Sequence, residues 1–347
     1  MQRSLFRNPA DFGTRPQKTM EALIDMLRQG YQLGALPGYQ RKYCIAASSF
    51  GRECDACVRI CPENVFQSGR KDKKPDFTKC TRCGACAAAC PTAALSPTDT
   101  QTRNFLMALA KQEPLSVGCE EDVAAWSVSL PCLAALRWEQ ICCAALRFGV
   151  ILSLRSCGSC GKRECAAHVL ETIARAKEFL GDALFYETVE LLEEGDVFTP
   201  RGKAIPRREL FTFFKALPLD TAREMLPALS DGAQGALIYR GLLRDLVRER
   251  YASAPKGGRT GYVLSLPAIT DGCNACEMCV RMCPEKALRT VQGADGARRI
   301  AVQAWKCTAC GICEKACRAK AVRGMGKMAV PHLGTVAIRR QKTEDTP

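Results

Sequence analysis

Three cysteine runs in this chain have a spacing that is specific for one kind of metal centre. In each run the cysteines are separated by two, two and three residues. The runs are Cys80, Cys83, Cys86 and Cys90; Cys273, Cys276, Cys279 and Cys283; and Cys307, Cys310, Cys313 and Cys317. Three thiolates at this spacing can close on one face of a [4Fe–4S] cubane, while the fourth reaches a neighbouring cluster. Three such runs in one chain therefore predict an iron–sulfur protein.

A fourth run is incomplete. Cys54, Cys57 and Cys61 match the last three ligand positions, but the expected first position holds Gly51. We predict that Cys44, the nearest upstream cysteine, supplies the missing ligand from an insertion. The alternative is a three-iron cluster that lacks one corner.

Residues 44–97 and 262–325 each resemble the bacterial two-cluster ferredoxins. The resemblance rests on the cysteine runs and on the proline that follows Cys61, Cys90 and Cys283, whereas Arg318 follows Cys317. It implies short helices under small antiparallel ribbons, four [4Fe–4S] clusters, and exchange of the fourth ligand within each pair. The ligand sets implied are Cys80, Cys83, Cys86 and Cys61; Cys54, Cys57, Cys90 and Cys44; Cys273, Cys276, Cys279 and Cys317; and Cys307, Cys310, Cys313 and Cys283.

The middle of the chain has a different pattern, in which short apolar strands alternate with helices. Residues 115–117, 128–130 and 150–154 read as strands, and helices are expected over 133–148 and in the segment that carries Val169, Ile173 and Leu180. Such alternation predicts a small α/β unit with a parallel sheet, whose ligands lie beyond the carboxyl ends of the strands. Four cysteines fall at these ends and predict a fifth metal centre, either an iron–sulfur cluster or zinc: Cys119, Cys132, Cys157 and Cys160.

This arrangement faintly resembles the iron–sulfur delta subunit of methyl-viologen-reducing hydrogenases, which also places cysteines on an α/β unit. Cys165 is an alternative to Cys160 as a ligand of the fifth centre. Cys142 and Cys143 lie within the expected helix and read as buried packing groups, because a free cysteine behaves as a small hydrophobe.

The predicted fold class is α+β, with two ferredoxin-like 2[4Fe–4S] modules flanking the small α/β unit and a helical connector. The boundaries expected are an extension over 1–43, the first module over 44–97, the α/β unit over 98–180, the connector and linker over 181–261, the second module over 262–325 and a tail over 326–347. Helices are expected over 17–29, 184–194, 207–217 and 234–251. Hairpins are expected between 65–67 and 75–77 and between 288–292 and 298–303.

Composition and charge limit the class of protein. A disulfide framework is typical of small secreted chains, whereas this chain has 347 residues, 23 cysteines and no export signal in its first residues. No apolar run is long enough to span a bilayer, so we expect a cytoplasmic protein with thiolates available for metal. The formal charge is +14. Four clusters of charge about −2 would leave roughly +6, which suits an acidic redox partner and is weak evidence for nucleic acid.

The residues indicate electron transfer and supply no catalytic group. A cluster with four cysteine ligands has no open coordination site, and the only histidines are His168 and His332. No glycine-rich dinucleotide fingerprint follows a strand. We therefore expect a non-catalytic electron-transfer subunit of a larger cytosolic oxidoreductase, with redox proteins as partners and no nucleic acid or transmembrane segment. The alternative is an accessory protein for maturation of a metalloenzyme, in which the clusters are structural or sensory.

Overall fold

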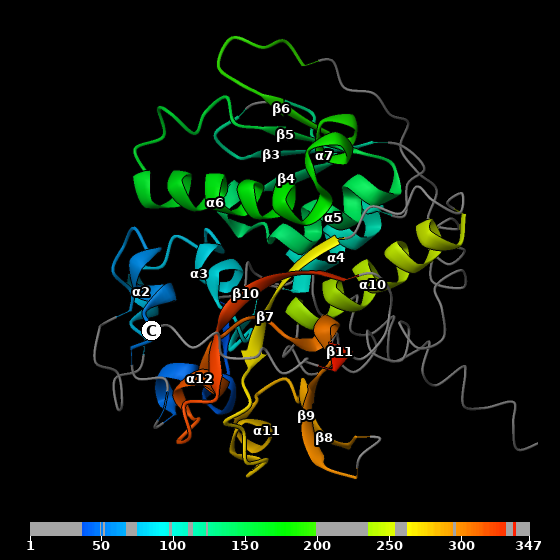
Figure 1. Ribbon diagram of the computed structural model, residues 1–347. Helices are drawn as coiled ribbons and strands as arrows, with labels where there is room; N and C mark the ends of the chain where they lie inside the picture. Colours follow the sequence, from blue (N-terminus) through cyan, green and yellow to red (C-terminus); the bar gives the residue numbers. More distant parts are fainter. Residues whose placement is uncertain are drawn as a thin grey trace, which may run out of the picture. The chain divides into compact units, whose positions relative to one another are not determined.

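The computed structural model describes residues 37–48, 50, 53–66, 75–96, 99–109, 114–122, 124–198, 235–253, 262–293, 296–330 and 336–337 (Figure 1). All of them belong to one compact unit, residues 36–347. The helices expected over 17–29 and 207–217, the linker over 254–261 and most of the tail lie outside the described residues.

The first cysteine-rich region is built from very short elements. They are β1 (Gly38–Tyr39), η2 (Arg41–Tyr43), η3 (Ile45–Ala47), α2 (Ala56–Arg59), η4 (Phe77–Lys79), α3 (Ala85–Ala89) and β2 (Leu95–Ser96). Strand β1 pairs antiparallel with β2, so the segment before Cys44 lies beside the segment after Cys90. The hairpin expected between 65–67 and 75–77 does not form as a pair of strands in its described residues, 65–66 and 75–77. A backbone hydrogen bond from Asp76 N to Val65 O at 3.1 Å joins them, and Phe77 begins a 3₁₀ turn instead.

The second cysteine-rich region repeats this plan with longer strands. Strand β7 (Tyr262–Ile269) pairs antiparallel with β10 (Val322–Val330), and β8 (Leu288–Gln292) forms a hairpin with β9 (Arg298–Val302), as the sequence predicts. Between the strands lie α11 (Met278–Met282), η6 (Ala304–Lys306) and α12 (Ile312–Lys315), and β11 (Val336–Ala337) adds to β9.

The middle of the chain forms a four-stranded parallel sheet in the order β4-β3-β5-β6. Its strands are β3 (Leu115–Cys119), β4 (Val128–Leu130), β5 (Val150–Ser153) and β6 (Val189–Leu192). The parallel pairing confirms the expected sheet. The helix expected over 184–194 is wrong in its second half, because α7 (Asp182–Thr188) ends where β6 begins and Val189 pairs with Val150.

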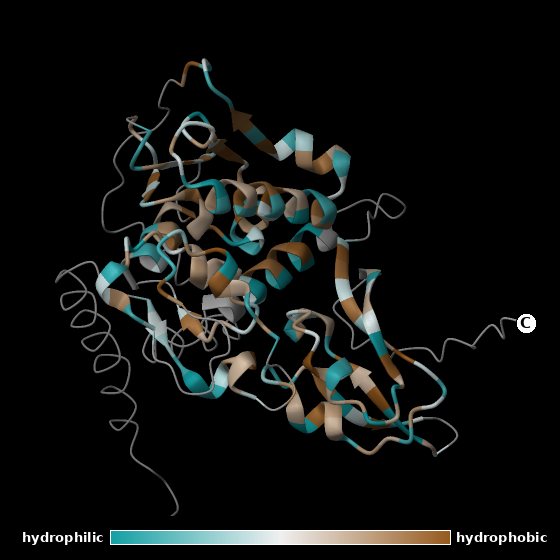
Figure 2. Ribbon diagram, turned by 90° about the vertical axis from the view of Figure 1, so that its left-hand side faces the viewer, coloured by the Kyte–Doolittle hydropathy of each residue, from teal (hydrophilic) through white to brown (hydrophobic). Residues whose placement is uncertain are grey.

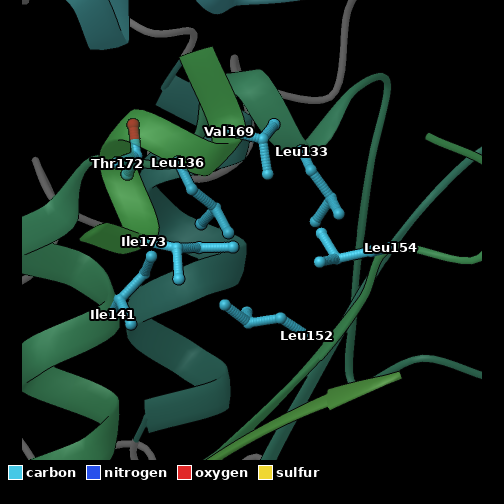
Figure 3. A pocket seen from close by; sticks show the side chains of 8 residues that line it. All are labelled: Leu133, Leu136, Ile141, Leu152, Leu154, Val169, Thr172 and Ile173. Atoms are coloured by element: carbon cyan, nitrogen blue, oxygen red, sulfur yellow. The ribbon is translucent and has the colours of Figure 1, made fainter. Parts of the chain in front are cut away.

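Helices cover this sheet and bury its apolar face. They are α4 (Asp99–Leu109), α5 (Trp138–Arg147) and α6 (Arg163–Leu180). The helix expected over 133–148 begins late, because residues 133–135 form the 3₁₀ turn η5. Figure 3 shows Ile141 of α5, Ile173 of α6 and Leu152 of β5 pointing into one small apolar space between helices and sheet. Figure 2 shows hydrophobic and hydrophilic residues intermixed along the helices, and continuous hydrophobic stretches in some of the strands.

Helix α10 (Gly235–Ser253) joins the parts of the chain. It packs against α5 of the α/β unit and against η6 of the second cysteine-rich region. Its Tyr239 is fully buried in an edge-to-face contact with Phe105 of α4, with ring centroids 5.6 Å apart. The predicted connector therefore contributes a central core helix.

Trp126 packs directly on Gly118 of β3, and this close packing can be tested by substitution of the glycine. A Cβ atom at Gly118 would lie 2.2 Å from Trp126 Nε1, whereas a Cβ atom at Gly158 would meet nothing within 4 Å. We expect Gly118→Ala to lower the free energy of unfolding by about 1–3 kcal/mol, as overpacking does, and Gly158→Ala to have little effect. Denaturant unfolding of the two variants checks this, and equal stability of both would contradict the packing described.

Candidate iron–sulfur cluster sites

The last cysteine of every run is followed by the same backbone turn. The third residue after it has a positive φ, namely 49° at Asn64, 49° at Ala93, 50° at Lys286 and 50° at Lys320. L-residues other than glycine adopt this conformation only where the surrounding structure requires it. The turn also aims backbone N–H groups at sulfur. Val65 N lies 3.4 Å from Cys61 Sγ, Ala287 N lies 3.2 Å from Cys283 Sγ, and Ala321 N lies 3.2 Å from Cys317 Sγ.

The three complete runs curl in the same way. The second residue after the first cysteine has a positive φ in each run, at Arg82, Ala275 and Ala309. The residue after the second cysteine does so too, at Gly84, Glu277 and Gly311. These left-handed residues turn the chain so that its three thiols face a common centre. In the incomplete run, Asp55 follows Cys54 with φ −124°, so that loop has a different shape.

Cys44 has the backbone setting of a first ligand. Its φ and ψ are −72° and 116°, compared with −73° and 119° at Cys80 and −75° and 117° at Cys307, and a 3₁₀ turn precedes each of the three. The backbone hydrogen bond four residues before Cys44 also matches. Gln40 N donates to Ala94 O at 2.8 Å. Gln303, which lies four residues before Cys307, donates in the same way to Ala287 O. This similarity supports Cys44 as the missing first ligand of the incomplete run.

Thiols from different runs lie close enough to raise one another's pKa. Burial and then neighbouring thiols raise the pKa of Cys279 to about 11, that of Cys310 to about 11, and those of Cys54, Cys86 and Cys313 as well. In the first module, Cys90 and Cys44 act on Cys54, and Cys83, Cys57, Cys80 and Cys61 act on Cys86. In the second module, Cys273, Cys317 and Cys276 act on Cys279. There, Cys283 and Cys307 act on Cys310, and the same two thiols together with Cys310 act on Cys313. The structure thus brings together the predicted exchange partners, each from the other run of its module.

The surroundings of these thiols fit a cluster. One cavity is lined by Cys61, Cys80, Cys83 and Cys86 together with the apolar Val65 and Phe66. Four thiols that repel one another when ionised need a cationic core between them, and binding of iron releases their protons. In the described part of the chain, no group of three or more His, Cys, Asp or Glu side chains could hold a single metal ion. Thiolates of one cubane bind different iron atoms, so they are spaced more widely than the ligands of one ion.

One cluster site reaches the molecular surface. Of the 23 cysteines, all of which lie in the described ranges, only Cys276 is exposed. Its carbonyl oxygen accepts a hydrogen bond from Arg281 Nη2 at 3.2 Å. Glu277, the next residue, pairs with Arg298.

The two modules face each other across a cleft of about 220 Å³. Cys54 and Cys310 both line this cleft. Lys315 Nζ lies 2.5 Å from Glu53 Oε2 and pairs one module with the other. The ligand runs of the two modules therefore border one space.

The cysteines of the middle segment gather at the carboxyl edge of the parallel sheet. Cys119 ends β3, Cys132 follows β4 and Cys157 follows β5. Burial and then Cys119, Cys132 and Cys160 raise the pKa of Cys157 to about 12. Beside them, Asp122 accepts a hydrogen bond from Arg155 Nη2 at 2.6 Å, which anchors the loop after β3 to the loop after β5.

Sequence reasoning did not anticipate how Cys165 is placed. This buried thiol hydrogen-bonds to Cys132 and to Cys83, which belongs to a predicted cluster of the first module. These contacts lower the pKa of Cys83 to about 6 and that of Cys132 to about 7. By contrast, Cys160 Sγ points to the carbonyl of Cys157 at 3.8 Å. Cys142 and Cys143 are fully buried and donate to backbone carbonyls, as their packing role requires.

A buried charge network was also missed. Glu139 is 1% exposed and accepts a hydrogen bond from Arg240 Nε at 2.9 Å, and Arg137 Nε lies 3.4 Å from its other oxygen. Arg137 Nη1 donates to the carbonyls of Ala87, Ala88 and Cys90 at 3.0–3.2 Å. The signal in the sequence is an acidic residue, Glu139, in a helix whose residues from Ile141 to Leu146 are all apolar.

Comparison with known proteins identifies two segments. Residues 272–321 match a family described as a 4Fe-4S dicluster domain, and residues 73–96 match one described as a 4Fe-4S binding domain. No curated protein and no solved structure matches the chain. The chain therefore contains two ferredoxin-type domains of the kind that binds [4Fe–4S] clusters. Nothing found supports the resemblance to the delta subunit. No helix among the described residues is long and apolar enough to cross a bilayer.

The role of Cys44 can be tested by removing its sulfur. We expect Cys44→Ala to cost the protein between one and about four irons per chain, because a [4Fe–4S] cluster that lacks one ligand either loses one iron or is lost. Alanine is chosen because a serine oxygen could replace the sulfur as a ligand. Iron and sulfide analysis of anaerobically purified protein measures this. Cys142→Ala, which changes a buried thiol outside the cluster sites, is the matched control. Full retention of iron in Cys44→Ala would exclude this cysteine as a ligand.

Proposed function

We propose that this chain is an electron-transfer subunit that holds four [4Fe–4S] clusters. The observation that carries the proposal is the set of four cysteine groups, each completed by a thiol from another run and each flanked by the same left-handed turn. Such a cluster supplies one-electron transfer when bound. The chain contributes the thiol ligands, the N–H groups aimed at sulfur and the apolar walls, which together control potential and solvent access.

We propose that the two modules exchange electrons across the cleft between Cys54 and Cys310. Both residues line it, and the exposed ion pair Lys315–Glu53 joins its two sides. The four clusters would then form one continuous series, in which the site at Cys276 is the end open to solvent.

We also propose a fifth centre at the carboxyl edge of the parallel sheet, and we favour an iron–sulfur cluster over zinc there, because no three side chains in the described part of the chain could hold a single metal ion. Cys119, Cys132 and Cys157 end or follow adjacent strands and interact electrostatically. The fourth ligand is Cys160, with Cys165 as the alternative. The contact of Cys165 with Cys83 and Cys132 supports a direct connection between this centre and the first module.

The partners we propose are redox proteins in the cytoplasm, above all the catalytic subunit of an oxidoreductase. Support comes from the solvent-open site at Cys276 and from a modestly basic chain, since exposed basic groups steer acidic partners.

Anaerobic purification tests the function directly. We expect about sixteen irons per chain with matching sulfide, from four clusters of four irons each, and further metal if the fifth centre is present. Reduction at low potential should give electron paramagnetic resonance signals from reduced clusters. A colourless protein that holds only zinc, or centres that accept no electrons, would overturn the proposal.

The cleft between the modules can be tested by charge reversal. Lys315→Glu would place two carboxylates opposite each other, and we expect exchange between the modules to slow by at most about fivefold, because an exposed ion pair contributes no more than about 1 kcal/mol. Freeze-quench resonance spectroscopy after partial reduction measures this exchange. The double variant Lys315→Glu with Glu53→Lys restores the pair and should restore the rate. An unrestored rate would contradict the role of this pair.

A further inference from the structure

A buried guanidinium lies on the helix that covers the approach to one of the four cysteine groups. Arg240 on α10 is 3% exposed, and α10 packs against η6, the turn that leads directly into Cys307. Cys307 is itself buried. The helix that carries Arg240 therefore packs on the turn that positions one ligand of this predicted cluster.

Two buried hydrogen-bond donors, on α10 and on η6, have no acceptor among the described residues. They are Arg240 Nη1 and Trp305 Nε1. Trp305 lies in η6, two positions before Cys307, and is 8% exposed. An unsatisfied buried donor costs free energy, so two of them beside one cysteine group fit a bound group that presents acceptor atoms. The sulfur atoms of an iron–sulfur cluster are such acceptors.

The rest of the network fixes the guanidinium in place. Arg240 Nε donates to Glu139 at 2.9 Å, which turns one edge of the guanidinium toward α5. Its carbon Cζ lies over the Trp138 ring, 4.8 Å from the ring centre, where the cation is attracted to the ring face. The edge that carries Nη1 is left for another acceptor.

We propose that Arg240 and Trp305 donate hydrogen bonds to sulfur atoms of the cluster held by Cys283, Cys307, Cys310 and Cys313, and that the charge of Arg240 raises the reduction potential of this cluster. The proposal rests on the proposed function. Reduction adds a negative charge, which a buried cation stabilises strongly because the surrounding dielectric constant is low. Hydrogen bonds to sulfur act in the same direction. Glu139 binds Arg240 and opposes its charge, so Glu139 is a positioning residue whose effect on the potential has the opposite sign.

The experiment is a redox titration of the complete, cluster-loaded chain, monitored by electron paramagnetic resonance. In Arg240→Gln we expect one reduction step to move to lower potential while the others stay in place. In Glu139→Gln the same step should move to higher potential. Arg248→Gln removes an equal charge from an exposed position of the same helix and should move no step.

Two milder variants keep the test valid if Arg240→Gln does not fold. Arg240→Lys keeps the charge but loses the second donor edge, so the step should fall less than in Arg240→Gln. Trp305→Phe removes one N–H donor without a change of charge and should also lower the same step. A purely structural role would not move one step in opposite directions.

Each outcome is decisive. If every step stays in place in all variants, or if Arg240→Gln and Glu139→Gln shift the potential in the same direction, the inference is overturned while the four-cluster function stands. If the unaltered chain contains no reducible cluster, the proposed function itself fails. Iron and sulfide analysis of each variant separates these results from simple loss of a cluster.

Discussion

The buried contact between Glu139 and Arg240 ties together parts of the chain that are far apart in sequence. Glu139 lies on α5, Arg240 lies on α10, and the neighbouring Arg137 holds three carbonyls at the end of α3. Removal of one partner of a buried ion pair costs about 3–5 kcal/mol, because the other charge is left uncompensated. The network therefore fixes the relation between the first module, the α/β unit and the helix that contacts the second module.

The cysteine groups add a second constraint, which is electrostatic. Buried thiols that raise one another's pKa are a poor arrangement for a metal-free protein, since ionisation of any one makes ionisation of the next harder. The turns after the cysteine runs add a backbone cost, because four non-glycine residues have a positive φ there: Asn64, Ala93, Lys286 and Lys320. Both costs become understandable if iron is bound when the chain folds, because metal binding then contributes to folding.

Local features were predictable from sequence, and long-range ones were not. The cysteine runs and the hairpin of β8 and β9 depend on spacing and turn residues within a few positions, so they could be read directly. Strand β6 departs from the helix expected there, because a segment as short as Val189–Leu192 fits either structure until its partner strand is known. The contact of Cys165 with Cys83 and the pairing of Glu139 with Arg240 depend on tertiary packing, which no local pattern encodes.

The exposure of Cys276 bears on how the protein meets oxygen. The other cysteines are partly or fully covered by neighbouring groups, whereas Cys276 is open to bulk water. A cluster bound at Cys276 would be the one most open both to electron exchange and to attack by dioxygen. The same exposure that would serve a redox partner would therefore limit the lifetime of this centre in air.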